Sequence, residues 1–208
     1  MSVNYLGHVA VALATGRREP DFVLGAALPD LASMVGVRID RASLPPAVAD
    51  GVACHLAADT AFHDHHAFRS GAAALRHDLR VAGLPTGPRR AIGHAGWELL
   101  LDGSLVGTDT EVAYREALIG AGAVAASVAP AHRTRWAAMI GGGAPPRLRY
   151  DDPAWVTDRL VTMLARRPRL AVPHGAAPII TATLTAHVDA VVAASAALLD
   201  DVAATLTT

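Results

Sequence analysis

The stretch Cys54–Phe68 reads C-H-L-A-A-D-T-A-F-H-D-H-H-A-F and holds four of the chain's ten histidines. His55 and Asp59 are four residues apart, so on a helix their side chains project from one face. A second pair with the same spacing, His94 and Glu98, follows downstream. Imidazole and carboxylate groups with this spacing on separate helices are typical of a metal site inside a helical bundle. The stretch therefore predicts an all-α fold with a metal site in its core.

The composition also predicts helices. The chain has 208 residues, the length of one ordinary domain, and contains only three Phe, three Tyr and three Trp. Its abundance of Ala and Leu favours helix over sheet. The positions of Gly and Pro divide it into about seven to nine helices within a single domain over residues 1–208. We expect the first helix at about Asn4–Ala14 and the last at roughly Ile179–Ala204, with Pro29 kinking or breaking the second.

Charge, cysteine content and hydropathy bear on the partners and the cellular compartment that we expect for the protein. The formal net charge of −1 does not indicate a nucleic-acid partner. The single cysteine, Cys54, excludes an internal disulfide framework and fits a reducing compartment. The apolar stretch Ile179–Leu199 contains His187 and Asp189, which favours a core helix over a membrane span. We expect a cytoplasmic protein with no membrane span and no signal peptide, and we leave its oligomeric state open.

The candidate metal ligands lie on at least four segments, so only the folded chain brings them together. Asp59 is the best candidate to bridge two ions, because other candidates flank it in sequence. Two or three divalent ions, with zinc or manganese favoured and iron as an alternative, would suit imidazole and carboxylate ligands. A metal-bound hydroxide could then attack a phosphate ester at neutral pH. In chain order, the candidate ligands are His8, Asp30, His55, Asp59, His65, His94 and Glu98.

Other residues near these ligands receive more specific roles. Asp59 is expected to act at the reaction centre, with Asp30 or Asp64 as the general base. Arg69 is a weaker candidate for contacting the substrate, because a guanidinium group matches a pair of phosphate oxygens. His63 and His66 are interpreted as residues outside the metal ligands. The remaining histidines, which lack a partner at metal spacing, are His77, His132, His174 and His187.

The order of the candidate ligands resembles that of the zinc-dependent phospholipase C and single-strand nuclease superfamily. The chain also resembles the acyl carrier protein phosphodiesterase family, a family of compact helical cytoplasmic proteins. The resemblance covers about the first half of the chain, and it implies a phosphate-ester substrate carried on an acyl carrier protein. Its motifs are N-Y-L-G-H-V-A-V-A at Asn4–Ala12, G-A-A-L-P-D at Gly25–Asp30 and H-L-A-A-D-T-A-F-H-D-H at His55–His65.

The chain departs from both families. It has neither the N-terminal Trp ligand of the phospholipases nor their further His between the positions of Asp30 and His55. Either Asp40 or Asp50 would complete a site for a third ion, or the centre holds two ions. The carrier-protein phosphodiesterases have Arg at the position of Leu56. They also have acids where this chain has a His-x3-Glu pair, which shifts the expected metal preference toward zinc.

Two other classes of function fit the same residues. A helical cluster of His and Asp can hold paired iron and activate O₂, so a di-iron oxygenase is one alternative. The other is a non-catalytic helical module whose histidines bind metal only for stability, or do not bind it.

Overall fold

The structure is a computed structural model that describes residues 5–140 and 148–207, and within these ranges the chain is all-α. The only pairing of strand type in the described residues is an isolated bridge between Ile39 and Val128. The all-α prediction and the expected number of helices are confirmed. The α-helices are α1 (Tyr5–Ala14), α2 (Pro20–Val35), α3 (Pro46–Asp64), α4 (His66–Val81), α5 (Thr86–Ser104), α6 (Asp109–Ile119), α7 (Arg133–Ile140), α8 (Pro153–Ala165) and α9 (Ala177–Leu206). Three short 3-10 helices are η1 (Arg41–Ser43), η2 (Gly120–Ser127) and η3 (Pro130–His132).

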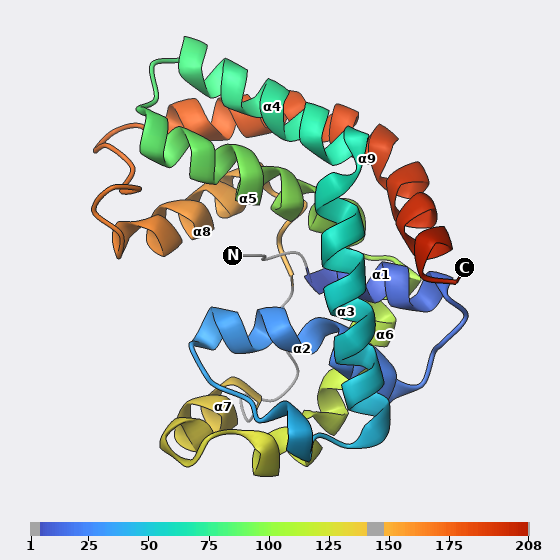
Figure 1. The fold of residues 1–208 in the computed structure, drawn as a ribbon. Helices are drawn as coiled ribbons and strands as arrows, with labels where there is room; N and C mark the ends of the chain where they lie inside the picture. Colours follow the sequence, from blue (N-terminus) through green and yellow to red (C-terminus); the bar gives the residue numbers. More distant parts are fainter. Residues whose placement is uncertain (1–4, 141–147, 208) are drawn as a thin grey trace.

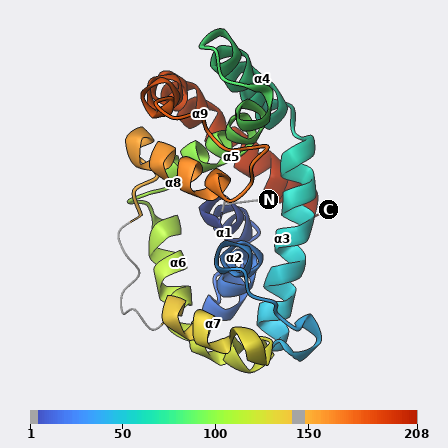
Figure 2. The ribbon, with the colours of Figure 1, turned by 90° about the vertical axis from the view of Figure 1, so that its left-hand side faces the viewer.

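The helices form two packed groups that share α3. Helices α4, α5, α8 and α9 pack together at the top of Figure 1, and α1, α2, α6 and α7 lie below them. Helix α3 runs from one group to the other, and it packs most extensively on α2. Helix α1 contacts α2, α3, α5, α6 and α9, and Figure 2 shows α1 and α2 between α3 and α6. Helix α1 therefore lies between the two groups and contacts members of both.

Two glycines allow α2 and α3 to cross with their backbones in contact. A Cβ atom added to Gly25 would lie 2.2 Å from the carbonyl oxygen of Val48, and one added to Gly51 would lie 2.1 Å from that of Phe22. No real Cβ atom fits at such distances, so only glycine permits this approach. Because His55 lies one helical turn after Gly51, the crossing carries its imidazole into the core.

The helix boundaries agree with the sequence except at Pro29. Helix α2 continues through Pro29 to Val35, so of the expected kink or break, the break does not occur. The residues on both sides of it, including Leu28 and Leu31, are buried, and this packing holds the helix together despite the missing backbone donor. The expected start at Asn4 lies outside the described residues, and α9 is two residues longer at each end than expected.

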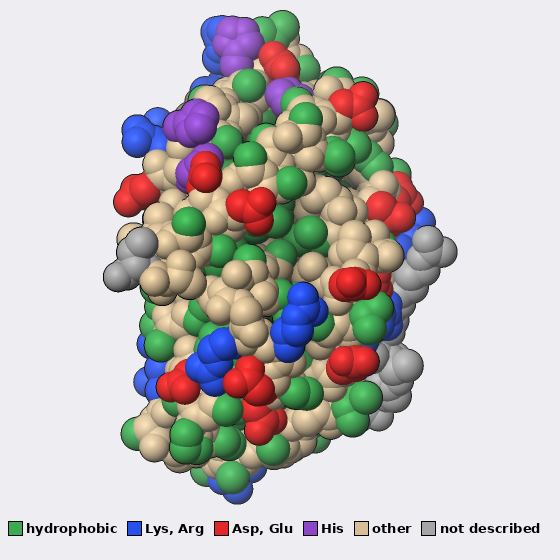
Figure 3. All heavy atoms as spheres, turned by 90° about the vertical axis from the view of Figure 1, so that its right-hand side faces the viewer, with side chains coloured by type: hydrophobic (Ala, Val, Ile, Leu, Met, Phe, Trp, Pro, Cys, Tyr) green, Lys and Arg blue, Asp and Glu red, His purple; other side chains and the backbone are tan. Residues whose placement is uncertain are grey.

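Helix α9 is the one helix among the described residues that is long and apolar enough, by length and composition, to cross a membrane. In this fold it packs against α1, α3, α4, α5 and α8. Its His187 Nε2 lies 2.9 Å from Asp78 Oδ2 on α4. Figure 3 shows the face that carries the last part of α9, where charged and histidine side chains lie among hydrophobic ones. Helix α9 is a structural member of the bundle here, and the expected absence of a membrane span stays a prediction.

Candidate metal centre

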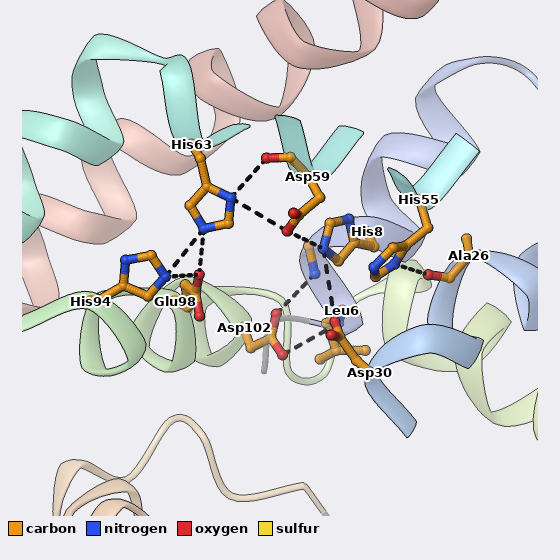
Figure 4. A network of polar contacts seen from close by, with 11 residues as sticks. Leu6, His8, Ala26, Asp30, His55, Asp59, His63, His94, Glu98 and Asp102 are labelled. Atoms are coloured by element: carbon orange, nitrogen blue, oxygen red, sulfur yellow. Dashed lines mark hydrogen bonds and ion pairs between the residues drawn. The ribbon is translucent and has the colours of Figure 1, made fainter. Parts of the chain in front are cut away.

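Histidine and carboxylate side chains from α1, α2, α3 and α5 meet where these helices converge (Figure 4). They form two groups, and within each group one potential ligand atom per residue lies within 4.8 Å of the others. We name these sets the inner group and the outer group. The inner group is His8, Asp30 and His55, and the outer group is His63, His94 and Glu98.

The inner group is buried and holds two neutral imidazoles. His8 and Asp30 are each 4% exposed, and His8 Nε2 lies 3.8 Å from Asp30 Oδ2. Burial lowers the pKa of His8 well below its usual value and lowers the pKa of His55 as well. His55 Nδ1 donates to the carbonyl oxygen of Ala26 over 2.7 Å, which leaves its Nε2 as the atom with a lone pair. A backbone acceptor of this kind is what orients a metal-binding histidine.

The outer group has a buried carboxylate beneath two stacked imidazoles. The rings of His63 and His94 are 4.9 Å apart with an interplanar angle of 7°. Glu98 is 0% exposed, and its Oε1 lies 3.0 Å from His63 Nε2 and 3.1 Å from His94 Nε2. Burial alone would raise the pKa of Glu98, but the hydrogen bonds from the two histidines lower it overall. Glu98 is therefore a carboxylate held ionised in the core.

Asp59 lies between the two groups, as Figure 4 shows. Its Oδ1 atom is 3.8 Å from His8 Nε2 of the inner group and 3.4 Å from His63 Nδ1 of the outer group. The contact with His63 is the largest cause of the lowered pKa of Asp59. The contacts of His63 with Asp59 and Glu98 in turn raise the pKa of His63 to about 10. Asp59 therefore couples the two groups electrostatically.

Two carboxylate oxygens in the cluster favour the presence of a cation. Asp59 Oδ1 and Glu98 Oε2 are buried and accept no hydrogen bond of good geometry from the described residues. A buried carboxylate oxygen without a donor is costly, and such atoms in a folded protein call for an ion or water. With imidazole nitrogens close by, the donor set is the N and O mixture that divalent zinc or manganese accepts. The residues present therefore fit a divalent metal.

The structure brings together every predicted ligand except His65. Helix α3 ends at Asp64, and His65 has an extended backbone (φ −67°, ψ 135°), so its side chain leaves the face that carries Asp59. His65 instead caps α4 by accepting from the backbone N–H of Ala67, and its Nε2 lies 3.3 Å from Asp201 Oδ2. His63, interpreted from the sequence as a residue outside the metal ligands, occupies the place expected for His65.

The other predicted residues lie outside both groups. Asp64 is exposed at the end of α3, and Arg69 is exposed on α4, where it lines a separate surface pocket of about 550 Å³. Asp40 caps η1, and Asp50 forms an ion pair with Arg17 at 3.3 Å. The described part of the chain contains two groups of three or more potential ligands, so this geometry accommodates two ions and assigns neither Asp40 nor Asp50 to a third.

One supporting residue was missed in the sequence. Asp102 lies one turn after Glu98 on α5, is 0% exposed, and accepts hydrogen bonds from the backbone N–H of Gly7 (2.9 Å) and Leu6 (3.3 Å). It thereby caps the start of α1 and fixes the helix that carries His8. Burial raises the pKa of Asp102 well above its usual value. The four-residue spacing from His94 to Glu98 continues to Asp102, and this repeat was the signal that could have found it.

Comparisons with models of protein families, with curated proteins and with solved structures found no match for this chain. The resemblance to acyl carrier protein phosphodiesterases therefore stays a prediction from the sequence motifs.

Proposed function

We propose that the chain is a metal-dependent hydrolase of phosphate esters in which the inner and outer groups each bind one divalent ion and Asp59 bridges them. The observation that carries the proposal is the position of Asp59 Oδ1, which is buried and lies within 4 Å of an imidazole nitrogen from each group. A bridging carboxylate between two histidine-containing sites is typical of centres that hold paired ions.

The buried residues of the cluster would hold the ions, and its partly exposed residues would face the incoming substrate. When bound, two divalent ions would activate water at neutral pH and neutralise charge on the attacking and leaving oxygens at phosphorus. The inner group and Glu98 are at most 4% exposed and hold a fixed geometry. Asp59, His63 and His94 are 28–38% exposed, so substrate reaches the centre from their side.

The geometry also bears on the predicted general base. Asp64 is exposed and belongs to neither group, whereas Asp30 is buried beside His8. Of the two, Asp30 is the residue whose carboxylate lies among the proposed ligands. We therefore retain Asp30 as a ligand that could also hold a proton, and we assign no role to Asp64. The acyl carrier protein partner rests on the sequence resemblance alone and forms no part of the proposal.

Substitution of Asp59 tests the proposal directly. Asp59→Asn should abolish hydrolysis of bis-(p-nitrophenyl) phosphate and reduce the bound metal, while circular dichroism shows an intact fold. Asp50→Asn is the matched control, because it makes the same change on an exposed face of α3 and loses only a surface ion pair with Arg17. Full metal content in Asp59→Asn would overturn the bridging role.

Metal analysis and an absorption spectrum of the wild-type protein, purified without added metal, separate the proposed hydrolase from the two alternatives. A colourless protein that contains zinc or manganese and hydrolyses the diester supports the proposal. Stoichiometric iron with a visible absorption band would favour an oxygenase instead. Tightly bound metal without turnover of any phosphate ester would favour the non-catalytic module.

A further inference from the structure

A groove of about 790 Å³ runs along α5 beside the outer group. Its walls come from α4, the first half of α5, the end of α8 and the turn that follows α8. His94 lines this groove and is also a member of the outer group, where its Nε2 lies 3.1 Å from Glu98 Oε1. The groove therefore opens onto the proposed metal centre at His94, on the side from which substrate would approach.

Arginine dominates the charge of this groove. Its lining includes four arginines and no carboxylate, although the whole chain has a net charge of −1. Within residues 5–140 and 148–207, none of the four forms an ion pair, whereas Arg17, Arg115 and Arg149 each pair with an acid. Clustered cations without counter-charges attract anions, and a guanidinium group matches a phosphate bidentately. The four are Arg76, Arg90, Arg167 and Arg169.

Two glycines of α5 allow the surrounding elements to close in on the groove. A Cβ atom on Gly93 would lie 2.0 Å from Arg76 Cγ, and one on Gly87 would lie 2.0 Å from the carbonyl oxygen of Arg169. Gly93 therefore leaves room for the side-chain stem of Arg76, and Gly87 lets the backbone of the turn that carries Arg169 approach α5. The backbone of the groove walls is packed, while the side chains of Arg167 and Arg169 are exposed to solvent.

We infer that this arginine groove binds a further phosphate group of the substrate, so that the substrate is an organic phosphate ester carrying a second phosphate or a diphosphate. The inference rests on the proposed hydrolase function and deepens it. The scissile phosphate would lie at the metal centre, while the second phosphate contacts the arginines. Apolar side chains of the lining would cover the organic part, and these include Ala91, Ala95, Met163, Leu164 and Leu170.

Binding of pyrophosphate to protein stripped of metal tests the inference without relying on turnover. In the presence of a chelator, calorimetry should show that wild-type protein binds pyrophosphate. Arg167→Gln and Arg169→Gln should each weaken binding roughly tenfold, the effect of losing one charge-assisted contact. Both side chains are exposed, so neither change should alter the thermal unfolding midpoint. Arg166→Gln is the matched control, since Arg166 is an exposed neighbour in the same turn that does not line the groove.

The outcomes separate the groove from the metal centre. Absence of pyrophosphate binding, or equal binding in wild type and both groove variants, overturns the inference. Hydrolysis of bis-(p-nitrophenyl) phosphate by the wild-type protein with metal restored reports separately on the metal centre, and the control Arg166→Gln, which lies outside the groove, should leave this hydrolysis unchanged. If Arg167→Gln and Arg169→Gln bind pyrophosphate more weakly but the wild-type protein hydrolyses no diester, the groove is a phosphate-binding site and the proposed hydrolase function is wrong.

Discussion

Zinc binding to this chain should release a proton from His63. The contacts of His63 with the carboxylates of Asp59 and Glu98 raise its pKa to about 10 in the protein without metal. Histidine binds zinc as neutral imidazole, so this proton must leave. At pH 7 its removal costs about 4 kcal/mol, three pKa units at about 1.4 kcal/mol each, and lowers the apparent association constant by about 1000-fold.

The other ligands with a perturbed pKa should contribute no proton. Burial lowers the pKa of His8 and His55, so both are already neutral at pH 7. The pKa values of Asp59 and Glu98 are also lowered, so both are already ionised. His63 alone among these five should make zinc affinity depend on pH, by about tenfold per unit between about pH 7 and 8.5.

Competition with a chromophoric chelator at several pH values measures this slope, and calorimetry in buffers of different ionisation enthalpy counts the released proton. In His63→Gln, zinc binding should release one proton fewer, and the slope of the logarithm of zinc affinity against pH should fall by about one. His77→Gln, a change at an exposed histidine of α4, should leave both unchanged. A wild-type zinc affinity that does not vary with pH, or the same pH dependence in His63→Gln, would show that His63 is not the source of the released proton.

Three further predictions concern the scaffold around the site. Gly25→Ala should lower the free energy of unfolding by about 1–3 kcal/mol, because its Cβ would meet the backbone of α3. Gly122→Ala is the control, since nothing lies within 4 Å of its added Cβ, and it should leave the free energy of unfolding unchanged. Urea unfolding measures both variants. His65→Ala should retain all bound metal and lose at most about 1 kcal/mol of stability, because His65 caps α4 and pairs with the exposed Asp201; loss of an ion in this variant would restore His65 as a ligand. Because the pKa of His63 is raised from 6.5 to about 10, its stabilisation of the metal-free fold is complete below pH 6.5 and lost as pH rises toward 10. The difference in unfolding free energy between wild type and His63→Gln should therefore shrink over that range, and a constant difference would contradict this cause.

The helices and the pairs within each helix were predictable because both depend on local spacing. His55 with Asp59 on α3 and His94 with Glu98 on α5 share a helical face wherever each helix is placed. The approach of these pairs to one another depends on how the helices pack. The sequence placed His65 rather than His63 beside the other candidate ligands because an interval in the sequence was carried across the end of a helix. His63 is one turn after Asp59 and stays on the same face, whereas His65 lies beyond the end of α3.

Features that depend on tertiary packing could not be read from the sequence. The passage of α2 through Pro29 depends on burial by neighbouring helices, which local propensity does not contain. The arginine groove combines Arg76 of α4 and Arg90 of α5 with the turn after α8, which is far from both in the chain. Only the packing of those helices shows that these arginines adjoin His94.

Anomalous diffraction at the zinc absorption edge, from crystals grown with zinc, shows whether a pair of ions binds at the inner and outer groups. The proposal predicts two peaks per chain, one within the inner group and one within the outer group, with the carboxylate of Asp59 between them. Peaks confined to surface histidines such as His66 and His77, or no peak at either group, would contradict a paired metal centre.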